Sequence, residues 1–170
     1  MHDHRVGPVT KRLELRALNV DDAPAFFALN SHPEVMRFTH EARLRSLEEA
    51  IDAIARYPDF DTVGFGRWGC VLKEEQRLIG FCGLKYLDDL DAVDLGYRFL
   101  PEYWGRGLAT EASLATIDFG FDVLELDRII GLVLPDNAGS VRVLEKVGMC
   151  LEGEMSYDGQ RVLQYSIHSK

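Results

Sequence analysis

The chain has 170 residues, of which 46% are hydrophobic and 28% are charged, so we expect one packed globular domain and exclude a disordered chain. Its 19 basic and 28 acidic residues give a formal net charge of -9, which argues against nucleic acid as a partner because binding it requires a basic face. An acidic field would suit a cationic substrate better, although many soluble proteins are acidic for solubility alone.

The cysteines and the hydropathy pattern bear on the compartment. Cys70, Cys82 and Cys150 are widely spaced and form no CxxC pair, which predicts neither a disulfide framework nor a zinc site. Each lies between apolar residues, so we expect three buried free thiols in a reducing compartment. No apolar run approaches the ~18 residues of a membrane span, and the N-terminal residues lack the apolar core of a signal peptide. We therefore expect a cytoplasmic protein without a membrane partner.

The first part of the chain predicts one strand and two helices. Residues 11–18 alternate apolar and polar side chains with period two, as a half-buried strand does. Residues 21–29 begin with two aspartates and Pro24, a helix start with an N-cap and a first-turn proline. Residues 46–57 begin with Ser-Leu-Glu-Glu, a capping box for a second helix. Residues 31–45 between them have no firm period, and we expect a loop with a helical turn.

The remainder of the chain alternates strand and helix patterns. Strands are predicted at 64–72, 77–87, 92–100, 127–134, 149–155 and 161–168, and helices at 109–121 and 137–147. The order is β-αα-βββ-α-β-α-ββ, without a linker or repeat. This order predicts an α/β (α+β) fold with a mixed sheet of seven strands and helices on both faces.

The stretch Glu-Tyr-Trp-Gly-Arg-Gly-Leu-Ala-Thr-Glu-Ala-Ser at 102–113 places two glycines between a predicted strand and a predicted helix. A helix N-terminus presents free N–H groups and a positive dipole end to anions, and glycine lets the backbone approach a ligand closely. One interpretation is a pyrophosphate cradle made by the amides of Gly105, Arg106, Gly107, Leu108, Ala109 and Thr110. The other is a tight turn without a ligand, and the spacing alone favours neither.

Two other phosphate motifs fit this stretch poorly. The P-loop string GxxxxGKS/T does not occur in the chain. The dinucleotide fingerprint GxGxxG has Thr110 at its third glycine, and it should follow the first strand of a βαβ unit rather than a late, antiparallel-looking meander. We therefore expect no NAD(P)H binding, which argues against a dinucleotide-dependent oxidoreductase.

The longer string Gly-Tyr-Arg-Phe-Leu-Pro-Glu-Tyr-Trp-Gly-Arg-Gly-Leu-Ala-Thr-Glu-Ala at 96–112 resembles the acetyl-CoA motif of the GNAT N-acetyltransferases. The superfamily pattern is Q/R-x-x-G-x-G/A, and Trp104, Gly107 and Ala109 hold those three positions. Tryptophan in the first position departs from the general pattern but is usual in the RimJ/RimL-like branch, named for ribosomal-protein N-terminal acetyltransferases.

Four more segments resemble that branch, in the same order along the chain. They are the opening strand at 10–16, the segment after the first helix at 32–38, a strand at 78–83, and the helix pattern N-x-x-S-x-x-V/L-x-x-K-x-G at 137–148. The resemblance covers nearly the whole chain. It implies a single GNAT domain over 1–170 with a mostly antiparallel sheet, and acetyl-CoA as co-substrate.

The resemblance also implies how acetyl-CoA lies on the chain. Its pantetheine would pair with backbone near Phe99 and Leu100, where a bulge separates the strand at 92–100 from the one at 127–134. Asn137 and Ser140 would contact the pantetheine and the sulfur, and Arg106 would meet the phosphates. Asn137 is also explained as a plain helix N-cap and Arg106 as a solvated surface residue.

The chemistry requires two proton transfers, and the first concerns the departing thiolate. In the superfamily a tyrosine of the helix after the second motif commonly protonates it, and Leu144 stands in that position here. Ser140 is the nearest hydroxyl in the sequence, with an ordinary first-turn helix serine as the alternative. Donors at the separated strands would polarise the thioester carbonyl.

The second transfer takes a proton from the amine. An α-amino group titrates near 8 and a polyamine amine near 10.4, so a weak base is enough for the former. Asp94 is our first candidate, with an exposed structural acid as the alternative, and Glu154 is a weaker one. The histidines are weaker still, namely His2 and His4 near the terminus and His32 and His40 in loops that would instead shape an acceptor groove. No metal-binding constellation is predicted.

These observations predict an acetyl-CoA-dependent N-acetyltransferase that acts on a primary amine by direct attack in a ternary complex. The segments 31–45 and 157–160 would shape the acceptor site. The acceptor is left open among a protein N-terminus, a polyamine, an aminoglycoside and a metabolite amine, and the protein is expected to be a monomer or a homodimer. The absent tyrosine at Leu144 keeps a second hypothesis, a non-catalytic CoA-binding regulatory protein of the same fold.

Overall fold

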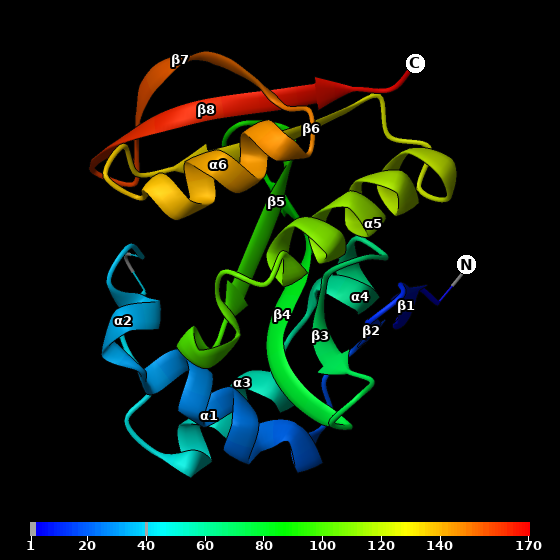
Figure 1. The fold of residues 1–170 in the computed structure, drawn as a ribbon, viewed down its shortest axis with the longest axis vertical. Helices are drawn as coiled ribbons and strands as arrows, with labels where there is room; N and C mark the ends of the chain where they lie inside the picture. Colours follow the sequence, from blue (N-terminus) through cyan, green and yellow to red (C-terminus); the bar gives the residue numbers. More distant parts are fainter. Residues whose placement is uncertain (1–2, 40) are drawn as a thin grey trace.

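The computed structural model describes residues 3–39 and 41–170, in which one mixed sheet extends through the molecule (Figure 1). Its strands lie in the order β1-β2-β3-β4-β5-β6-β8-β7. The strands are β1 Val6–Val9, β2 Leu13–Arg16, β3 Arg67–Leu72, β4 Arg77–Leu87, β5 Ala92–Phe99, β6 Arg128–Val133, β7 Cys150–Tyr157 and β8 Gln160–His168. Neighbouring strands are antiparallel except β5 and β6, which are parallel. The mixed, mostly antiparallel sheet is confirmed, with eight strands instead of the predicted seven.

The additional strand is β1, and long-range packing explains why its sequence did not reveal it. The segment Val-Gly-Pro-Val has no alternation and contains a proline, which usually argues against a strand. It forms an edge strand beside β2 with a register shift. Gly7 lies so close to the Trp68 ring that a Cβ there would be 2.7 Å from it. The strand therefore depends on a tryptophan about sixty residues further along the chain.

The helices follow the predicted order, with two short additions. Their bounds are α1 Ala23–Ser31, α2 Pro33–Met36, α3 Leu47–Ala55, α4 Asp59–Thr62, α5 Leu108–Asp122 and α6 Ala138–Lys146, with 3-10 turns η1 Val20–Asp22 and η2 Pro101–Tyr103. Helix α2 is the helical turn expected within 31–45, whereas α4 was not predicted. The Ser46 side chain caps α3 by accepting the Glu49 N–H at 3.1 Å. The Glu49 carboxylate accepts the Arg45 N–H instead of that of Ser46, so only half of the predicted capping box forms.

Helices cover both faces of the sheet, as predicted. On one face, the Cys82 sulfur of β4 lies 3.4 Å from the Thr116 hydroxyl of α5, and α6 packs on the same side (Figure 1). On the other face, Phe81 of β4 lines a cavity together with Phe26 of α1 and Ile54 of α3. Adjacent residues of β4 thus point to opposite helical layers, as the pleat of a strand requires.

The parallel contact between β5 and β6 is short and determines where the site lies. Only Asp94 and Ile130 are paired across it, whereas β4 and β5 pair along eight positions. Beyond Asp94 the two strands separate toward the end of β5. The two strands are therefore paired only briefly in the middle of the sheet, while β5 keeps an unbroken register with β4, so the bulge that the resemblance implied does not appear in that pairing.

The cysteines correct one expectation. Cys70 and Cys82 are fully buried free thiols, as predicted, but Cys150 is exposed. Cys150 begins β7, an edge strand of the sheet with mostly exposed residues. Apolar neighbours in sequence therefore did not place it in the core. Burial raises the pKa of the Cys82 thiol to about 11. Among the described residues, no helix is long and apolar enough to span a membrane.

Candidate active site

The glycine turn leads directly into α5 and leaves backbone N–H groups free. Gly105 and Gly107 have φ of 74° and 76°, a left-handed conformation that favours glycine. Gly107 is the N-cap of α5 and its carbonyl accepts the Glu111 N–H at 3.0 Å, so the helical hydrogen bonds begin there. The amides that precede Glu111 at the helix start have no intrahelical acceptor. The geometry at Leu108, Ala109 and Thr110 is therefore that of an anion-binding helix end.

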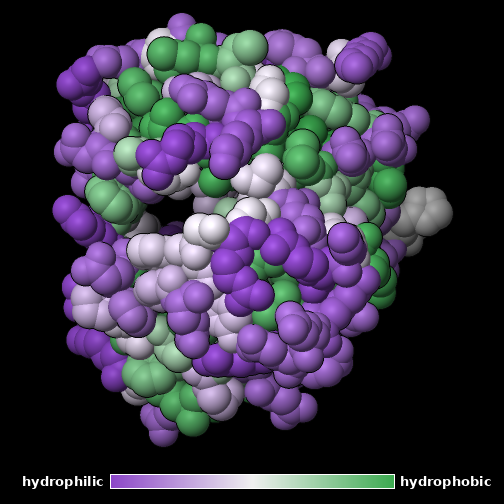
Figure 2. All heavy atoms as spheres, viewed as in Figure 1, coloured by the Kyte–Doolittle hydropathy of each residue, from purple (hydrophilic) through white to green (hydrophobic). Residues whose placement is uncertain are grey.

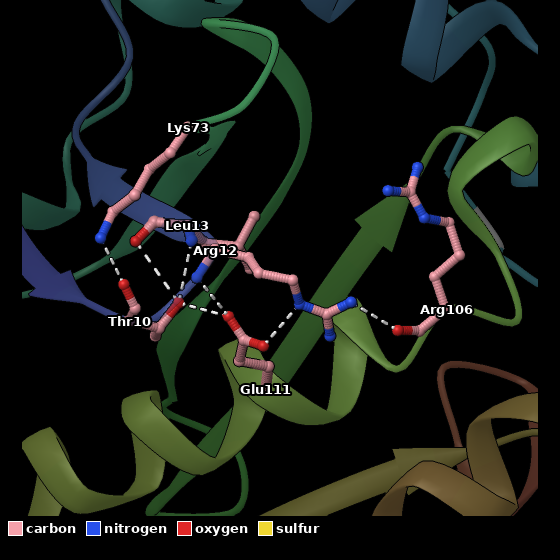
Figure 3. Close-up of polar contacts among 6 residues, drawn as sticks. All are labelled: Thr10, Arg12, Leu13, Lys73, Arg106 and Glu111. Carbon is pink, nitrogen blue, oxygen red and sulfur yellow. Dashed lines mark hydrogen bonds and ion pairs between the residues drawn. The ribbon is translucent and has the colours of Figure 1, made fainter.

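Arg12 holds this turn from the N-terminal side of the chain (Figure 3). Its Nη1 donates to the Arg106 carbonyl at 2.8 Å, and its Nε donates to Glu111 Oε1 at 2.8 Å. The other Glu111 oxygen accepts the Thr10 hydroxyl at 2.6 Å. Partial burial opposes ionisation of Glu111, yet the bonds from Thr10 and Arg12 keep its pKa below the ordinary value. Sequence reasoning missed this contact, because Arg12 and Glu111 lie 99 positions apart.

The other side chains of the turn point elsewhere. The Arg106 guanidinium lies over the Tyr103 ring, 5.6 Å from its centroid, and points away from Arg12 (Figure 3). The Trp104 indole N–H donates to the Phe99 carbonyl at 2.7 Å, which ties the turn to the end of β5. The turn is thus fixed at both ends while Arg106 stays exposed to solvent.

The backbone at the end of β5 differs between the two residues predicted to pair with pantetheine. Both polar groups of Leu100 have protein partners, since its N–H donates to Ile79 and its carbonyl accepts the Tyr103 N–H. Alternate residues of a strand direct these groups to opposite edges, so those of Tyr97 and Phe99 face the gap toward β6. The Phe99 carbonyl is the one that Trp104 contacts.

A cavity of about 380 Å³ lies at the gap between β5 and β6. It brings together Asp94, Asn137 and Ser140, which are far apart in the sequence. Phe38, Thr39, Tyr157 and Asp158 also line it, so the two segments expected to shape the acceptor site border this cavity. Figure 2 shows the surface hollowed between the part that carries α6 and the part that carries α2.

Two hydroxyl groups meet at the α6 side of the cavity. The Asn137 side chain caps α6 by accepting the Ser140 N–H at 3.2 Å, as its N-cap reading predicted. The Tyr97 hydroxyl donates to Ser140 Oγ at 3.0 Å, and burial raises the pKa of Tyr97 to about 12. Leu144 is buried and packs against Gly131. Sequence reasoning looked for a tyrosine on the helix and missed Tyr97, whose one signal was its place on the strand next to the gap.

Asp94 lies on the opposite side of the sheet from Tyr97. Its Oδ1 is buried and has no hydrogen-bond partner in the described part of the chain. Burial raises the pKa of Asp94 to about 7, although Arg67, the Leu132 N–H and Lys85 favour the charged form. Burial thus shifts the pKa of this carboxyl group from the ordinary range of an aspartate toward neutral pH.

The weaker candidates lie outside this cavity. Glu154 is exposed on β7 and its Oε2 accepts Arg161 Nε at 2.7 Å. His32 caps α2, where its Nδ1 accepts the Glu34 N–H, and the His4 ring packs edge-on against Phe119. His2 and His40 lie outside the described residues. Within residues 3–39 and 41–170, no group of three or more metal-binding side chains is suited to hold an ion.

Comparison with known proteins agrees with this geometry. The sequence profile of the Acetyltransferase (GNAT) domain matches residues 12–150. The uncharacterised N-acetyltransferase YoaA of Bacillus subtilis is 36% identical over 146 residues, which cover 85% of this chain and 82% of that protein.

Two solved structures share the fold, each at an identity that shows the fold alone. The ribosomal-protein-S5-alanine acetyltransferase of Vibrio fischeri superposes with a TM-score of 0.78 at 21% identity, covering 96% of each chain. The spermidine N-acetyltransferase of Vibrio cholerae in complex with CoA and spermine has a TM-score of 0.75 at 23% identity, covering 92% of this chain and 95% of that one. On the profile match and the identity to YoaA, the chain belongs to the GNAT family of N-acetyltransferases.

Proposed function

We propose that the protein transfers the acetyl group of acetyl-CoA to a primary amine by direct attack in a ternary complex. The observation that carries this proposal is the cavity between β5 and β6, where Asp94 approaches from one face and Ser140 with Tyr97 from the other. Acetyl-CoA supplies an activated acetyl thioester and a thiolate leaving group. The protein supplies groups that bind the donor, accept a proton and stabilise the departing sulfur.

The helix start at α5 suits the CoA pyrophosphate. Its donors are backbone N–H groups at Gly105 to Thr110 beside the positive end of the helix dipole, and the Arg12 guanidinium adds charge. Replacement of Gly107 by valine should abolish CoA binding, since a β-branched residue is strained at φ 76°. Gly64→Val is the matched control, because its φ is 87° and it lies far from the turn in sequence. Equal CoA affinity in the two variants would contradict this placement.

Other residues would hold the rest of the donor. We place the phosphates near Arg106 and the pantetheine against the backbone of Phe99, with Asn137 and Ser140 beside it. Leu100 remains a predicted contact, and its two backbone groups would have to be shared with Ile79 and Tyr103. The CoA complex of the Vibrio cholerae spermidine N-acetyltransferase, which has the same fold, supports a donor site of this kind.

Ser140 and Tyr97 would stabilise the leaving sulfur. A thiol titrates near 8.5, whereas the pKa of Tyr97 is about 12, so the tyrosine stays protonated throughout. Ser140 therefore would donate a hydrogen bond to the sulfur while Tyr97 donates to Ser140 Oγ, and no full proton transfer from Tyr97 is needed. Tyr97, which lies on β5, thus would perform part of the role that the family's usual tyrosine has at the position of Leu144.

Asp94 would be the general base. A base is most effective when its pKa lies near the working pH, and the pKa of Asp94 is about 7. Its buried, unpartnered Oδ1 is free to accept a proton from the incoming amine. An α-amino group near pKa 8 would need less help than a polyamine amine near 10.4.

The acceptor class and the finer family branch also belong to the proposal. The RimJ/RimL-like branch implies a protein N-terminus, and polyamines, aminoglycosides and metabolite amines are the other candidates. The segments 31–45 and 157–160 would select among them, because both border the cavity. We propose a cytoplasmic enzyme with one domain over 1–170 and no nucleic acid or membrane partner, and both a monomer and a homodimer fit this proposal.

A thiol-release assay with acetyl-CoA tests the activity against peptides, polyamines, aminoglycosides and amino acids. Transfer to at least one amine, lost in Asp94→Asn, is the expected result. CoA binding by calorimetry without transfer to any acceptor would favour the second candidate, a non-catalytic CoA-binding protein, whose support is the buried Leu144 at the usual tyrosine position.

A further inference from the structure

We call the cavity at the gap between β5 and β6 the catalytic cavity. It shares a wall with a second cavity of about 450 Å³ beneath α1 and α3. Among the described residues, both are lined by Glu41, Arg67, Phe81, Lys85 and Arg98. We call these five residues the charged wall. The second cavity continues away from it over apolar side chains, among them Leu18, Phe26, Met36, Leu44, Ile54 and Phe60. A molecule whose amine lies at Asp94 and which extends into the second cavity therefore passes the charged wall.

Both arginines of the charged wall are held in place. Each guanidinium lies 5.3 Å from the centroid of the Phe81 ring. Arg98 also donates to Asn30 Oδ1 at 2.8 Å and to Thr39 Oγ1 at 3.0 Å. Arg67 crosses the sheet over Gly96, where a Cβ would lie 3.1 Å from Arg67 Nη2. Gly96 is thus needed for Arg67 to reach the catalytic cavity.

The positive charge of the wall exceeds what the chain itself neutralises. Among the described residues that line the catalytic cavity, the three cationic side chains Arg67, Lys85 and Arg98 interact with two carboxylates. Glu41 lies 3.2 Å from Arg98 and 4.0 Å from Arg67, and Asp94 interacts electrostatically with Arg67 and Lys85. Arg67 Nε is buried and has no hydrogen-bond partner within the described ranges. Lys85 interacts electrostatically with both Glu41 and Asp94. The chain as a whole carries -9, so this is a local reversal of charge. A buried N–H without a partner is costly, which indicates that a ligand supplies the acceptor.

We propose that the charged wall binds a carboxylate of the acceptor, so that the substrate is a small amine carrying a carboxylate and an apolar side chain. This inference rests on the proposed acetyltransferase function. Lys85 lies directly opposite Asp94 across β4 and β5, so a carboxylate bound at Lys85 and Arg67 places a neighbouring amine near the base. The apolar side chain then occupies the cavity beneath α1 and α3. A polyamine would instead bring further cations against three cationic side chains.

Glu41 has a defined place in this proposal. It occupies the position between Arg67 and Arg98 where an acceptor carboxylate would bind, and therefore competes with it. Replacing it by glutamine removes the competing charge while keeping the size of the side chain. Glu41→Gln should thus bind the acceptor more tightly, whereas Lys85→Met and Arg67→Gln should bind it more weakly. Opposite effects from neighbouring substitutions are not expected from a general loss of folding.

The first experiment compares each amino acid with its own amide in the thiol-release assay, using leucine, methionine and phenylalanine and adding spermidine. We expect at least one free acid to exceed its amide about 10-fold or more in kcat/KM, the effect of a charge-assisted hydrogen bond. The amide lacks the carboxylate that raises the pKa of the neighbouring ammonium, so its amine is more often neutral. A preference for the acid therefore cannot come from amine reactivity.

The second experiment measures binding of the same acids and amides to the CoA-loaded protein by calorimetry. The acid should bind about 10-fold tighter than the amide, Lys85→Met and Arg67→Gln should remove this difference, and Glu41→Gln should enlarge it. Arg128→Gln is the matched control, because it removes one positive charge outside both cavities.

The two experiments separate the two proposals. Amides or spermidine used as efficiently as the free acids would overturn the carboxylate site while leaving the acetyltransferase function intact. Selective binding of the acids without any thiol release would support the carboxylate site and contradict the proposed turnover. Equal binding of acids and amides, unaffected by the substitutions, would overturn the carboxylate site on its own.

Discussion

At the scale of single residues, Asp94 and Tyr97 owe their chemical properties to the fold. They lie three positions apart on β5, and each is largely removed from water between the separated strands. Burial disfavours the charged form of both side chains, and it raises the pKa of Asp94 to about 7 and that of Tyr97 to about 12. These pKa values suit the roles that we propose, a base that works near neutral pH for Asp94 and a hydrogen-bond donor for Tyr97.

Asp94→Asn should lower activity and raise stability together. We expect kcat/KM to fall about 100-fold, a typical contribution of a general base, and the rise of wild-type activity through about pH 7 to disappear. The folded pKa lies above the ordinary 3.8, so the folded state binds more protons between about pH 4 and 7, and stability falls as pH rises through that range.

Asparagine does not ionise, so the stability of the variant should not fall as pH rises through this range. It should exceed the wild type by about 4 kcal/mol in free energy of unfolding at pH 8, and by little at pH 4. Urea denaturation at both pH values measures this difference. An equal difference at the two pH values would show that Asp94 is not the titrating group.

Tyr97→Phe tests the hydroxyl pair. The phenyl ring keeps its packing while Ser140 loses its hydrogen-bond donor, so kcat should fall about 5-fold with little change in KM for acetyl-CoA. Tyr86→Phe is the control, because its hydroxyl donates to Asp91 outside the cavities. Steady-state kinetics give both values, and a variant with unchanged kcat would exclude Tyr97 from the chemistry.

At the scale of elements, the start of α5 is positioned by β2 and not by its own capping residue. Gly107 has no side chain with which to cap the helix, which leaves the helix end open to a ligand. Its conformation is instead fixed by Arg12, which joins the Arg106 carbonyl to Glu111. A helix end that binds an anion needs free N–H groups, so the support has to come from elsewhere in the fold.

Glu111→Gln tests whether the contact between Arg12 and Glu111 acts by fixing the glycine turn or only by the charges of the two side chains. Removing a negative charge near a pyrophosphate site should by itself strengthen CoA binding, whereas loosening the turn should weaken it. We expect the support to dominate and the Kd for CoA to rise about 5-fold, with a stability loss of no more than about 1 kcal/mol for this partly exposed pair. Calorimetry measures the Kd, and tighter binding would mean that Arg12 contributes charge alone.

At the scale of the whole molecule, net charge and site charge have opposite signs. The acidic composition suggested a cationic substrate, whereas the charged wall gathers arginine and lysine beside the catalytic cavity. Composition averages over the surface, and only the fold selects which side chains face the ligand. The net charge, which governs long-range attraction of a substrate, and the side chains that contact the substrate in the cavity are therefore separate properties of this protein.

The cysteines test the fold as a whole. Cys70 and Cys82 are fully buried, and burial raises the pKa of both thiols, while Cys150 is exposed. A thiol reagent at pH 8 should therefore modify one cysteine per folded chain and all three after denaturation. Cys150→Ser should abolish the reaction of the folded chain. Rapid modification of two or three thiols under native conditions would contradict the core described above.

Local patterns in the sequence were enough to predict most elements and part of the site. Period-two alternation, the Asn137 cap and the glycine turn each depend on residues within a few positions of one another, and the structure confirms the elements they predicted. The eighth strand and the exposure of Cys150 were missed, because each depends on what packs against the segment.

By itself, the sequence determined the order of most elements, the motif at the start of α5 and the membership in the GNAT family that the comparisons confirm. Only the tertiary structure decided that the Oδ1 atom of Asp94 is buried and that Tyr97 meets Ser140. The same holds for Arg12, which reaches the glycine turn, and for the arginines that gather at the charged wall. The physical reason is that a pKa, an ion pair and a cavity depend on distances in space, which the folded sheet sets between residues far apart in the chain.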